Sequence, residues 1–316
     1  MEGLVREFLC YLEQERNRSV CTVENYGADL NAFCKYVRQL DKELSWEDVD
    51  ASIVRGWMEE MADNGNKPSS VNRRLCSLRA FFRYGISCGK LHCNPACRVK
   101  GSKKEKPLPQ YLRDEEMERL LDKKYWDETF ADVRLRTIIL TFYSTGIRLA
   151  ELQGLDDGSV DRQQDVLRVV GKRNKVRLVP FGEELKTELA FYQTVRNEMF
   201  GDGCGALFVD DGGERMTSRR IRSEVIKRIS MVTTMKKRSP HVLRHTFATA
   251  MLDNGSGIEE VQKLLGHESV STTEVYTHTS FGQLRKVYSG AHPRGGTPKK
   301  RDWENELCRS GDSSIK

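Results

Sequence analysis

Six residues of this 316-residue chain have the types and the order needed to act together on a phosphate ester. His241 and Arg244 stand three positions apart, so on a helix both project from one face. Pro240 precedes them, where the first turn of a helix tolerates proline. The other members are two cations upstream and a histidine and a tyrosine downstream: Arg148, Lys172, His267 and Tyr276. The set predicts chemistry at a phosphodiester, with a side-chain nucleophile and cations around the phosphate.

Cutting a phosphodiester without water or a metal requires a nucleophile that stores the bond energy in a covalent ester, and Tyr276 can supply it. The attacked phosphate gains negative charge, which fixed cationic donors stabilise. Arg148 and Arg244 can each bind two phosphate oxygens, as lysine cannot. Ordinary structural interpretations stay open at this point: Tyr276 is one of 10 tyrosines, and Arg148 could pair with Glu151 at a helix end.

The distribution of charge points to a polyanionic partner. The net charge is only +6, but residues 67–106 contain 11 lysines and arginines against the single acid Glu105. Residues 213–245 contain 10 against 2, whereas residues 1–66 contain 7 against 14 acids. One basic segment is ordinarily a solvated face, but two favour a nucleic acid.

Composition indicates a globular protein of about two domains. With 38% hydrophobic and 31% charged residues, the chain can build a core. Its apolar runs are too short to span a membrane, and the N-terminus lacks a signal-peptide core. Nine scattered cysteines fit a reducing compartment. We therefore expect a cytoplasmic, nucleoid-associated protein with no membrane partner and no small-molecule substrate.

Apolar periodicity predicts a small four-helix domain over residues 1–88. The helices are expected at residues 3–17, at 22–40, between the cap Asp50 and the terminating Gly65, and after Pro68. Three arginines flank the apolar stripe of the last helix and can reach phosphate: Arg73, Arg79 and Arg83. Residues 89–110 are expected to form a basic linker, in which Lys103 and Lys104 would meet DNA by charge.

A second, α-rich domain is expected over residues 111–290. Its buried central helix covers residues 133–145 and ends at Gly146, which places Arg148 at the start of a short helix. Strands at 165–170 and 175–180 form a hairpin, and Leu207 to Val209 fit a further short strand. Helices are expected at 182–199, 217–230, 240–253, 258–265 and 269–276, followed by a polar tail at 291–316.

Other kinds of site are disfavoured. His241 and His245 have the spacing of zinc ligands, but Arg244 between them opposes a metal. Cys88, Cys93 and Cys97 with His92 match no common zinc spacing. Residues 85–90 contain a Gly-Lys pair without the spacing of a phosphate-binding loop. We therefore expect no metal, nucleotide or other cofactor.

Five stretches in order resemble motifs of the tyrosine recombinase/integrase family: residues 145–152, 171–177, 241–249, 264–267 and 272–278. The resemblance covers the second domain almost end to end. The first domain resembles the family's SAM-like core-binding domain, and residues 284–294 are similar to its Xer branch. The resemblance implies a mainly α protein whose two domains form a C-shaped clamp on DNA.

The resemblance also implies roles. Tyr276 would form a 3′-phosphotyrosyl intermediate, and Lys172 would protonate the departing 5′-oxygen, with Lys175 as the alternative. Arg173 stands where the family often has glycine, which leaves the conformation of the hairpin tip open.

The histidines and the acid have implied roles as well. His241 would handle the proton of the tyrosine, and His267 would bind the phosphate. Glu151 would support Arg148, so the salt-bridge interpretation of that arginine and its catalytic role are compatible.

The implied activity is site-specific cutting and rejoining of double-stranded DNA without metal or ATP. It would be carried out by a homo-tetramer, or by a hetero-tetramer with a paralogous recombinase. Xer-type resolution of chromosome dimers fits best. Open alternatives are DNA inversion, integration of a mobile element, a tyrosine-type topoisomerase and a catalytically idle DNA-binding protein. Residues 281–288 resemble the segment by which one subunit docks into its neighbour. The basic residues expected on DNA are Arg73, Arg79, Arg83, Lys103, Lys104, Arg219, Arg220 and Arg222.

Overall fold

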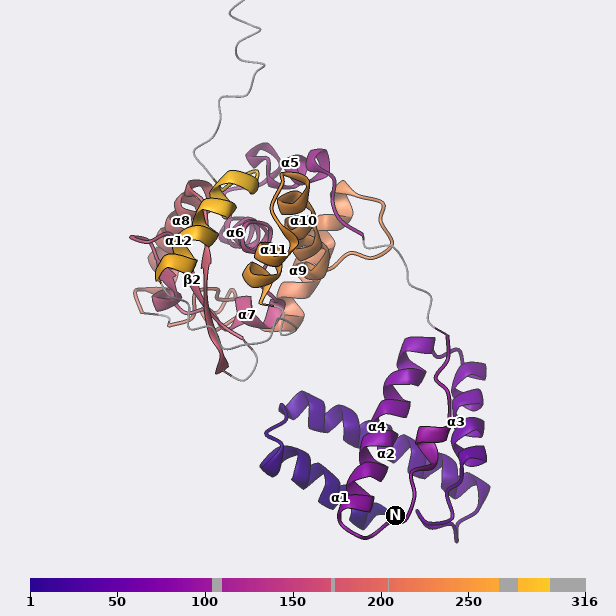
Figure 1. Ribbon diagram of the computed structural model, residues 1–316. Helices are drawn as coiled ribbons and strands as arrows, with labels where there is room; N and C mark the ends of the chain where they lie inside the picture. Colours follow the sequence, from indigo (N-terminus) through magenta and orange to yellow (C-terminus); the bar gives the residue numbers. More distant parts are fainter. Residues whose placement is uncertain (104–109, 172–173, 204, 267–277, 296–316) are drawn as a thin grey trace, which may run out of the picture. The chain divides into compact units, whose positions relative to one another are not determined.

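The computed structural model describes residues 1–103, 110–171, 174–203, 205–266 and 278–295 (Figure 1). The chain divides into two compact units, Met1–Pro107 and Leu108–Lys316, and each has a hydrophobic core of its own. Some of the expected features lie outside the described residues: Lys104, Lys172, His267, Tyr276 and the helix at 269–276.

The N-terminal unit contains the four expected helices. They are α1 (Glu2–Cys10), continued by the π-helical η1 (Tyr11–Glu15), α2 (Val20–Leu40), α3 (Ala51–Asp63) and α4 (Pro68–Ser87). Asp50 caps α3, since its carboxylate accepts the backbone N–H groups of Ser52 and Ile53 at 2.9 Å each. Gly65, with φ of +73°, follows the end of α3. The caps that the sequence predicted therefore form.

The core of this unit extends beyond residue 88. Leu91, Ala96 and Val99 are buried in it, and the 3-10 helix η2 (Pro95–Arg98) lies between them. The compact unit therefore continues into the segment for which the sequence predicted a linker from residue 89. These few apolar side chains are irregularly spaced, so only their packing against α3 and α4 reveals that the segment belongs to the unit.

In the C-terminal unit, α6 (Phe130–Thr145) is the central helix (Figure 1). It packs against α8 (Glu183–Phe200) and α10 (Pro240–Asp253), and nearly every residue from Val133 onward is buried. Its buried threonine hydroxyls donate to carbonyls one turn earlier, so these hydroxyls need no water. Gly146, with φ of +60°, ends the helix in the left-handed conformation that glycine adopts freely.

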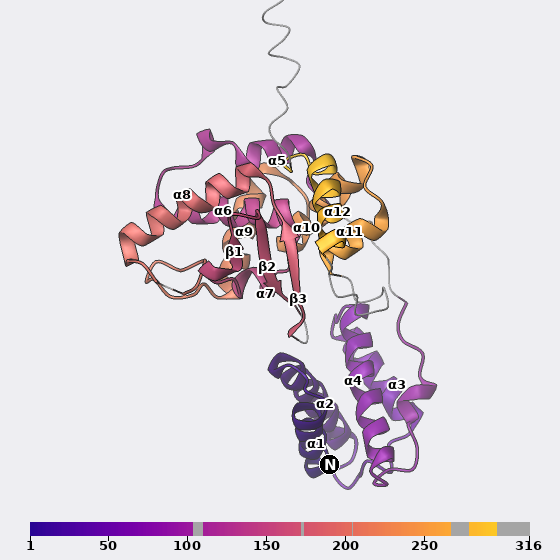
Figure 2. The same cartoon turned by 60° about the vertical axis from the view of Figure 1, so that its left-hand side comes forward.

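A three-stranded antiparallel sheet lies beside these helices (Figure 2). Its strands are β1 (Val160–Asp161), β2 (Val166–Val170) and β3 (Val176–Pro180), in the order β1-β2-β3. The expected hairpin is confirmed, and β1 is an addition. The strand expected at Leu207 to Val209 does not form, because residues 206–215 make only isolated bridges, Asp156 to Ala206 and Val209 to Arg215.

The remaining helices complete the unit: α5 (Asp114–Leu121), η3 (Lys123–Tyr125), α7 (Leu149–Gln153), η4 (Asp157–Ser159), α9 (Ser218–Val232), α11 (Ile258–Leu265) and α12 (His278–Ala291). Helix α12 packs against α10, α11 and β3, and α11 and α12 lie side by side in both views. His292 is buried just after α12, so the chain stays packed past the expected tail boundary at 291. Across the described ranges, none of the helices is long and apolar enough to cross a membrane.

Candidate active site

Arg148 lies where the central helix gives way to α7. The left-handed turn at Gly146 redirects the chain, and Arg148 then takes the N-cap position of α7. Its side chain is 41% exposed. Nη1 donates to Glu151 Oε1 at 3.0 Å, and Nη2 donates to the carbonyl of Gly266 at 3.1 Å. The guanidinium is thus fixed on one side and accessible to solvent on the other.

Arg244 reaches the same place from α10. Its guanidinium is buried and donates to the carbonyls of Gly146 at 2.6 Å and Leu265 at 2.8 Å. Burial, followed by the charge of Arg148, lowers the pKa of Arg244 to about 10, so it stays protonated at neutral pH. Because Leu265 and Gly266 are consecutive, the two arginines that the sequence selected lie side by side.

Glu151 holds this cluster of cations together. Its carboxylate accepts the backbone N–H of Arg148 at 2.7 Å and both Nη atoms of Arg177, at 2.7 and 2.8 Å. Burial raises the pKa of Glu151, but the hydrogen bonds and charge of Arg177, followed by the hydrogen bonds from Arg148, outweigh it and bring the pKa down to about 2. The carboxylate is therefore ionised at all physiological pH values.

His241 lies in the first turn of α10, one turn before Arg244. Partial burial lowers the pKa of its imidazole, and the nearby Arg244 and His245 act in the same direction. A neutral imidazole can accept a proton, which suits a group that handles the proton of a tyrosine.

Three expected members of the site, Lys172, His267 and Tyr276, lie outside the described residues, so their positions stay predictions. The residues beside them are described. Gly171 donates its N–H to the Lys175 carbonyl at 2.7 Å at the base of the hairpin, and Gly266, with φ of +65°, ends α11.

Arg177 belongs to the cluster, yet no role was predicted for it beyond its place in a matching motif. It lies on β3 opposite Val169, and it points to the buried side of the sheet, as Val179 does. An arginine at an inward position of an alternating strand is the signal that could have identified it, because a buried arginine requires a partner.

Several arginines expected on DNA make contacts within the chain. Arg79 donates to the carbonyls of Ala96 at 3.0 Å and Val99 at 2.6 Å. Arg220 pairs with Glu224 at 2.9 Å and also with Asp211. These contacts occupy donors that phosphates would otherwise take, and DNA contact by either arginine stays a prediction.

Arg73 is half-exposed and binds the buried carboxylate of Asp29 through both Nη atoms. Four further residues of the expected DNA-binding set are exposed: Arg83, Lys103, Arg219 and Arg222. Their exposure permits DNA contact, which stays a prediction.

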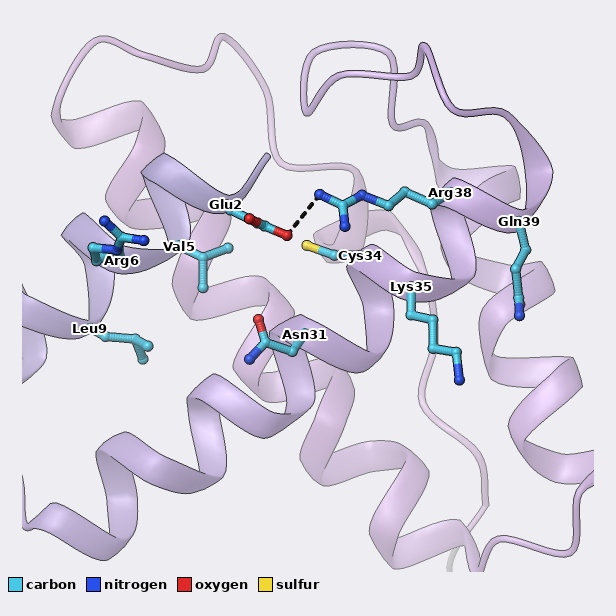
Figure 3. Close-up of a pocket in the computed structure, with 9 residues that line it drawn as sticks. All are labelled: Glu2, Val5, Arg6, Leu9, Asn31, Cys34, Lys35, Arg38 and Gln39. Carbon is cyan, nitrogen blue, oxygen red and sulfur yellow. Dashed lines mark hydrogen bonds and ion pairs between the residues drawn. The ribbon is translucent and has the colours of Figure 1, made fainter.

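A groove of about 620 Å³ lies between α1 and α2 in the N-terminal unit, where Glu2 pairs with Arg38 beside Cys34 (Figure 3). It contains none of the expected catalytic residues. Over the residues that the structure describes, no group of three or more His, Cys, Asp or Glu side chains is placed to hold a metal ion.

Comparisons with known proteins agree with the two units. Residues 110–283 match the phage integrase family, and residues 5–89 match the phage integrase N-terminal SAM-like domain. A tyrosine recombinase XerC of Syntrophus aciditrophicus (strain SB) is 37% identical over 310 residues, covering 94% of this chain and 100% of that protein. A tyrosine recombinase XerC of Haemophilus influenzae (strain Rd) is 38% identical over 289 residues, covering 92% and 97%.

The fold is similar to that of a solved recombinase. The XerH site-specific recombinase, bound to a palindromic difH substrate in a post-cleavage complex, superposes with a TM-score of 0.68 and 22% identity, covering 87% of this chain and 81% of that chain.

Proposed function

Because this chain belongs to the phage integrase family, we propose that it is a Xer-type tyrosine recombinase that cuts and rejoins double-stranded DNA through a 3′-phosphotyrosyl bond at Tyr276. The protein acts in the cytoplasm, and its substrate is a specific chromosomal site. The reaction needs neither metal nor ATP, since the phosphotyrosyl ester conserves the bond energy.

The convergence of Arg148 and Arg244 carries this proposal. They come from distant parts of the chain, yet they donate to the consecutive carbonyls of Gly266 and Leu265. Two guanidinium groups held side by side can bind both non-bridging oxygens of one phosphate and stabilise the charge that develops on it. The next residue in the chain is His267, which we assign to the same phosphate.

Two further assignments follow from the same arrangement. Lys172 protonates the departing 5′-oxygen, and its neighbour Gly171 lies at the base of the hairpin beside Glu151. His241, whose pKa is lowered, takes the proton of Tyr276.

We assign a tetramer on two paired sites, with a second copy or a paralogous recombinase as partner, and chromosome dimer resolution as the process.

Covalent capture tests the reaction. The protein is incubated with fragments of its own genome in EDTA, denatured, and recovered with any linked DNA for sequencing of the ends. We expect adducts with the wild type and none with Tyr276→Phe, which keeps its affinity for the same fragments. Adducts formed by Tyr276→Phe, or adducts that require a divalent metal, would contradict the mechanism.

The sequenced ends also test the process. A single palindrome-like site near the replication terminus supports dimer resolution. Ends that map to scattered inverted repeats or to the borders of a mobile element contradict it and indicate an invertase or an integrase. If adducts form only when a paralogous recombinase is added, the partner is the paralogue.

A further inference from the structure

Arg177 is one of the two buried cations of the arginine cluster, and Arg244 is the other. The side chain of Arg177 is 8% exposed, and that of Glu151 is 5% exposed. Both Nη atoms of Arg177 donate to the Glu151 carboxylate, at 2.7 and 2.8 Å. Its Nε donates to the carbonyl of Leu264 at 3.3 Å. Parallel bonds between a guanidinium and a carboxylate fix direction as well as distance. All three guanidinium nitrogens of Arg177 are engaged in these bonds, so we expect it to act through the groups that it holds.

Those groups include the end of α11. Three consecutive carbonyls there each accept a bond from a different arginine, and the arginines come from β3, α10 and the start of α7. The pairs are Arg177 with Leu264, Arg244 with Leu265, and Arg148 with Gly266. A Cβ atom at Gly266 would lie 3.2 Å from Cδ, Nε and Cζ of Arg177, so the arginine packs directly on the turn that ends the helix.

The base of the β2–β3 hairpin meets the same ion pair. A Cβ atom at Gly171 would lie 3.6 Å from Glu151 Oε1 and 3.7 Å from Arg177 Nη1. Arg177 itself belongs to β3, so its bonds to Glu151 join the hairpin to α7. Its bond to Leu264 joins the hairpin to α11.

We propose that Arg177 is a positioning residue for the recombination reaction: it aligns Arg148 through Glu151, and it fixes the hairpin base and the end of α11 relative to the phosphate-binding arginines. This inference rests on the proposed function. Arg177 does not touch substrate. It contacts Gly171, which precedes Lys172 in the chain, and Gly266, which precedes His267.

The charge balance explains why the position requires an arginine. Burial alone would raise the pKa of Glu151, and the donors of Arg177 are the largest influence against it. Without them Glu151 takes up a proton at a higher pH, and Arg148 then loses its anionic partner. A lysine at this position keeps the charge but cannot bind both carboxylate oxygens and Leu264 at once.

The test compares Arg177→Lys and Arg177→Met with Arg136→Lys. Arg136 is a matched control, because it pairs with Glu188 in the same unit and both side chains are 8% exposed. Single-turnover cleavage of the captured site and DNA affinity are measured from pH 5 to 9. We expect both Arg177 variants to cleave about 10²-fold more slowly, as small misplacements of catalytic groups do, with affinity nearly unchanged. Arg136→Lys should cleave at the wild-type rate.

Two further readouts separate positioning from loss of folding. In Arg177→Met the acidic limb of the pH–rate profile moves to higher pH, because Glu151 now titrates. Adding Arg177→Met to Glu151→Gln, which keeps the shape of the side chain, slows cleavage little further, since both changes break one link. Equal rates for Arg177→Lys and Arg136→Lys, or additive effects in the double variant, overturn the inference alone. A wild type that never cleaves overturns the proposed function together with it.

Discussion

The imidazole of His292 stacks on the ring of Tyr288, with the ring centroids 5.1 Å apart and 15° between the planes. Nε2 lies 3.0 Å from the carbonyl oxygen of Tyr143, and Nδ1 accepts the backbone N–H of Arg294. A neutral ring with its proton on Nε2 satisfies both contacts. Burial is the main cause that lowers the pKa of His292 to about 3, and the charge of Arg294 acts in the same direction.

Acidification should therefore loosen the C-terminal unit. Between pH 6.5, the ordinary value for histidine, and pH 3 the unfolded chain binds a proton at His292 that the folded chain does not, so the free energy of unfolding falls as pH falls. His292→Phe removes this titration. Although the variant loses two hydrogen bonds, its melting temperature should fall less from pH 7 to pH 5 than that of the wild type. Parallel pH dependences in calorimetry would show that His292 does not titrate in this way.

Loss of Arg148 should act on the reaction rather than on binding. Arg148→Ala removes one of two cationic donors at the phosphate, which costs roughly 3–4 kcal/mol of transition-state stabilisation. Single-turnover cleavage measures the rate, and fluorescence anisotropy measures the affinity for the captured site. The control is Arg168→Ala, an exposed arginine on β2 of the same unit. A cleavage rate for Arg148→Ala equal to that of the control would remove Arg148 from the active site.

The acidic side of the wild-type pH–rate profile should report His241. A proton acceptor must be neutral, so cleavage slows as pH falls through its pKa. Because burial and then Arg244 lower that pKa below 6.5, the rate should hold at pH 6.5 and decline only at lower pH. In His241→Ala the rate is low and this limb disappears. An unchanged limb in the variant would assign the titration to another group.

Asp29 should be a main determinant of stability in the N-terminal unit. Its buried carboxylate accepts both Nη atoms of Arg73 and, at 2.7 Å, the hydroxyl of Ser77. Asp29→Ala removes the acceptor of the buried Ser77 hydroxyl and the partner of the half-exposed Arg73, and losing hydrogen bonds to a charged group costs about 1.5–3 kcal/mol. Glu2→Ala breaks the exposed pair with Arg38 and should cost at most about 1 kcal/mol. Urea denaturation of the full chain, followed by tryptophan fluorescence, compares them, and similar losses would refute the role of burial.

Elements whose signals are local could be read from the sequence. The cap at Asp50 and the left-handed glycines at Gly65 and Gly146 depend on neighbouring residues only, and they place helix ends where the structure has them. The hairpin follows from alternation in β2 and β3. Strand β1 has two residues, which is too short for any periodicity to show.

Contacts between residues far apart in the chain could not be predicted from the sequence. Arg79 flanks an apolar stripe and looks free to bind phosphate, but carbonyls of a later segment take its donors. Arg177 looks like one more charge in a basic hairpin until β3 is placed against Glu151. In the candidate site, the sequence predicted the residue types, whereas the structure was needed to show that one carboxylate organises the arginines.

The acceptors that the arginines use on α11 belong to the backbone. A carbonyl is present whatever side chain a residue carries, so a substitution at Leu264 or Leu265 does not remove an acceptor. Gly266 is restricted by its φ of +65° and its contact with Arg177, whereas Leu264 and Leu265 are restricted by their burial in the core. A substitution at Leu264 or Leu265 therefore changes the packing of α11 against α10 and α12, whereas the acceptors of the arginines stay in the backbone.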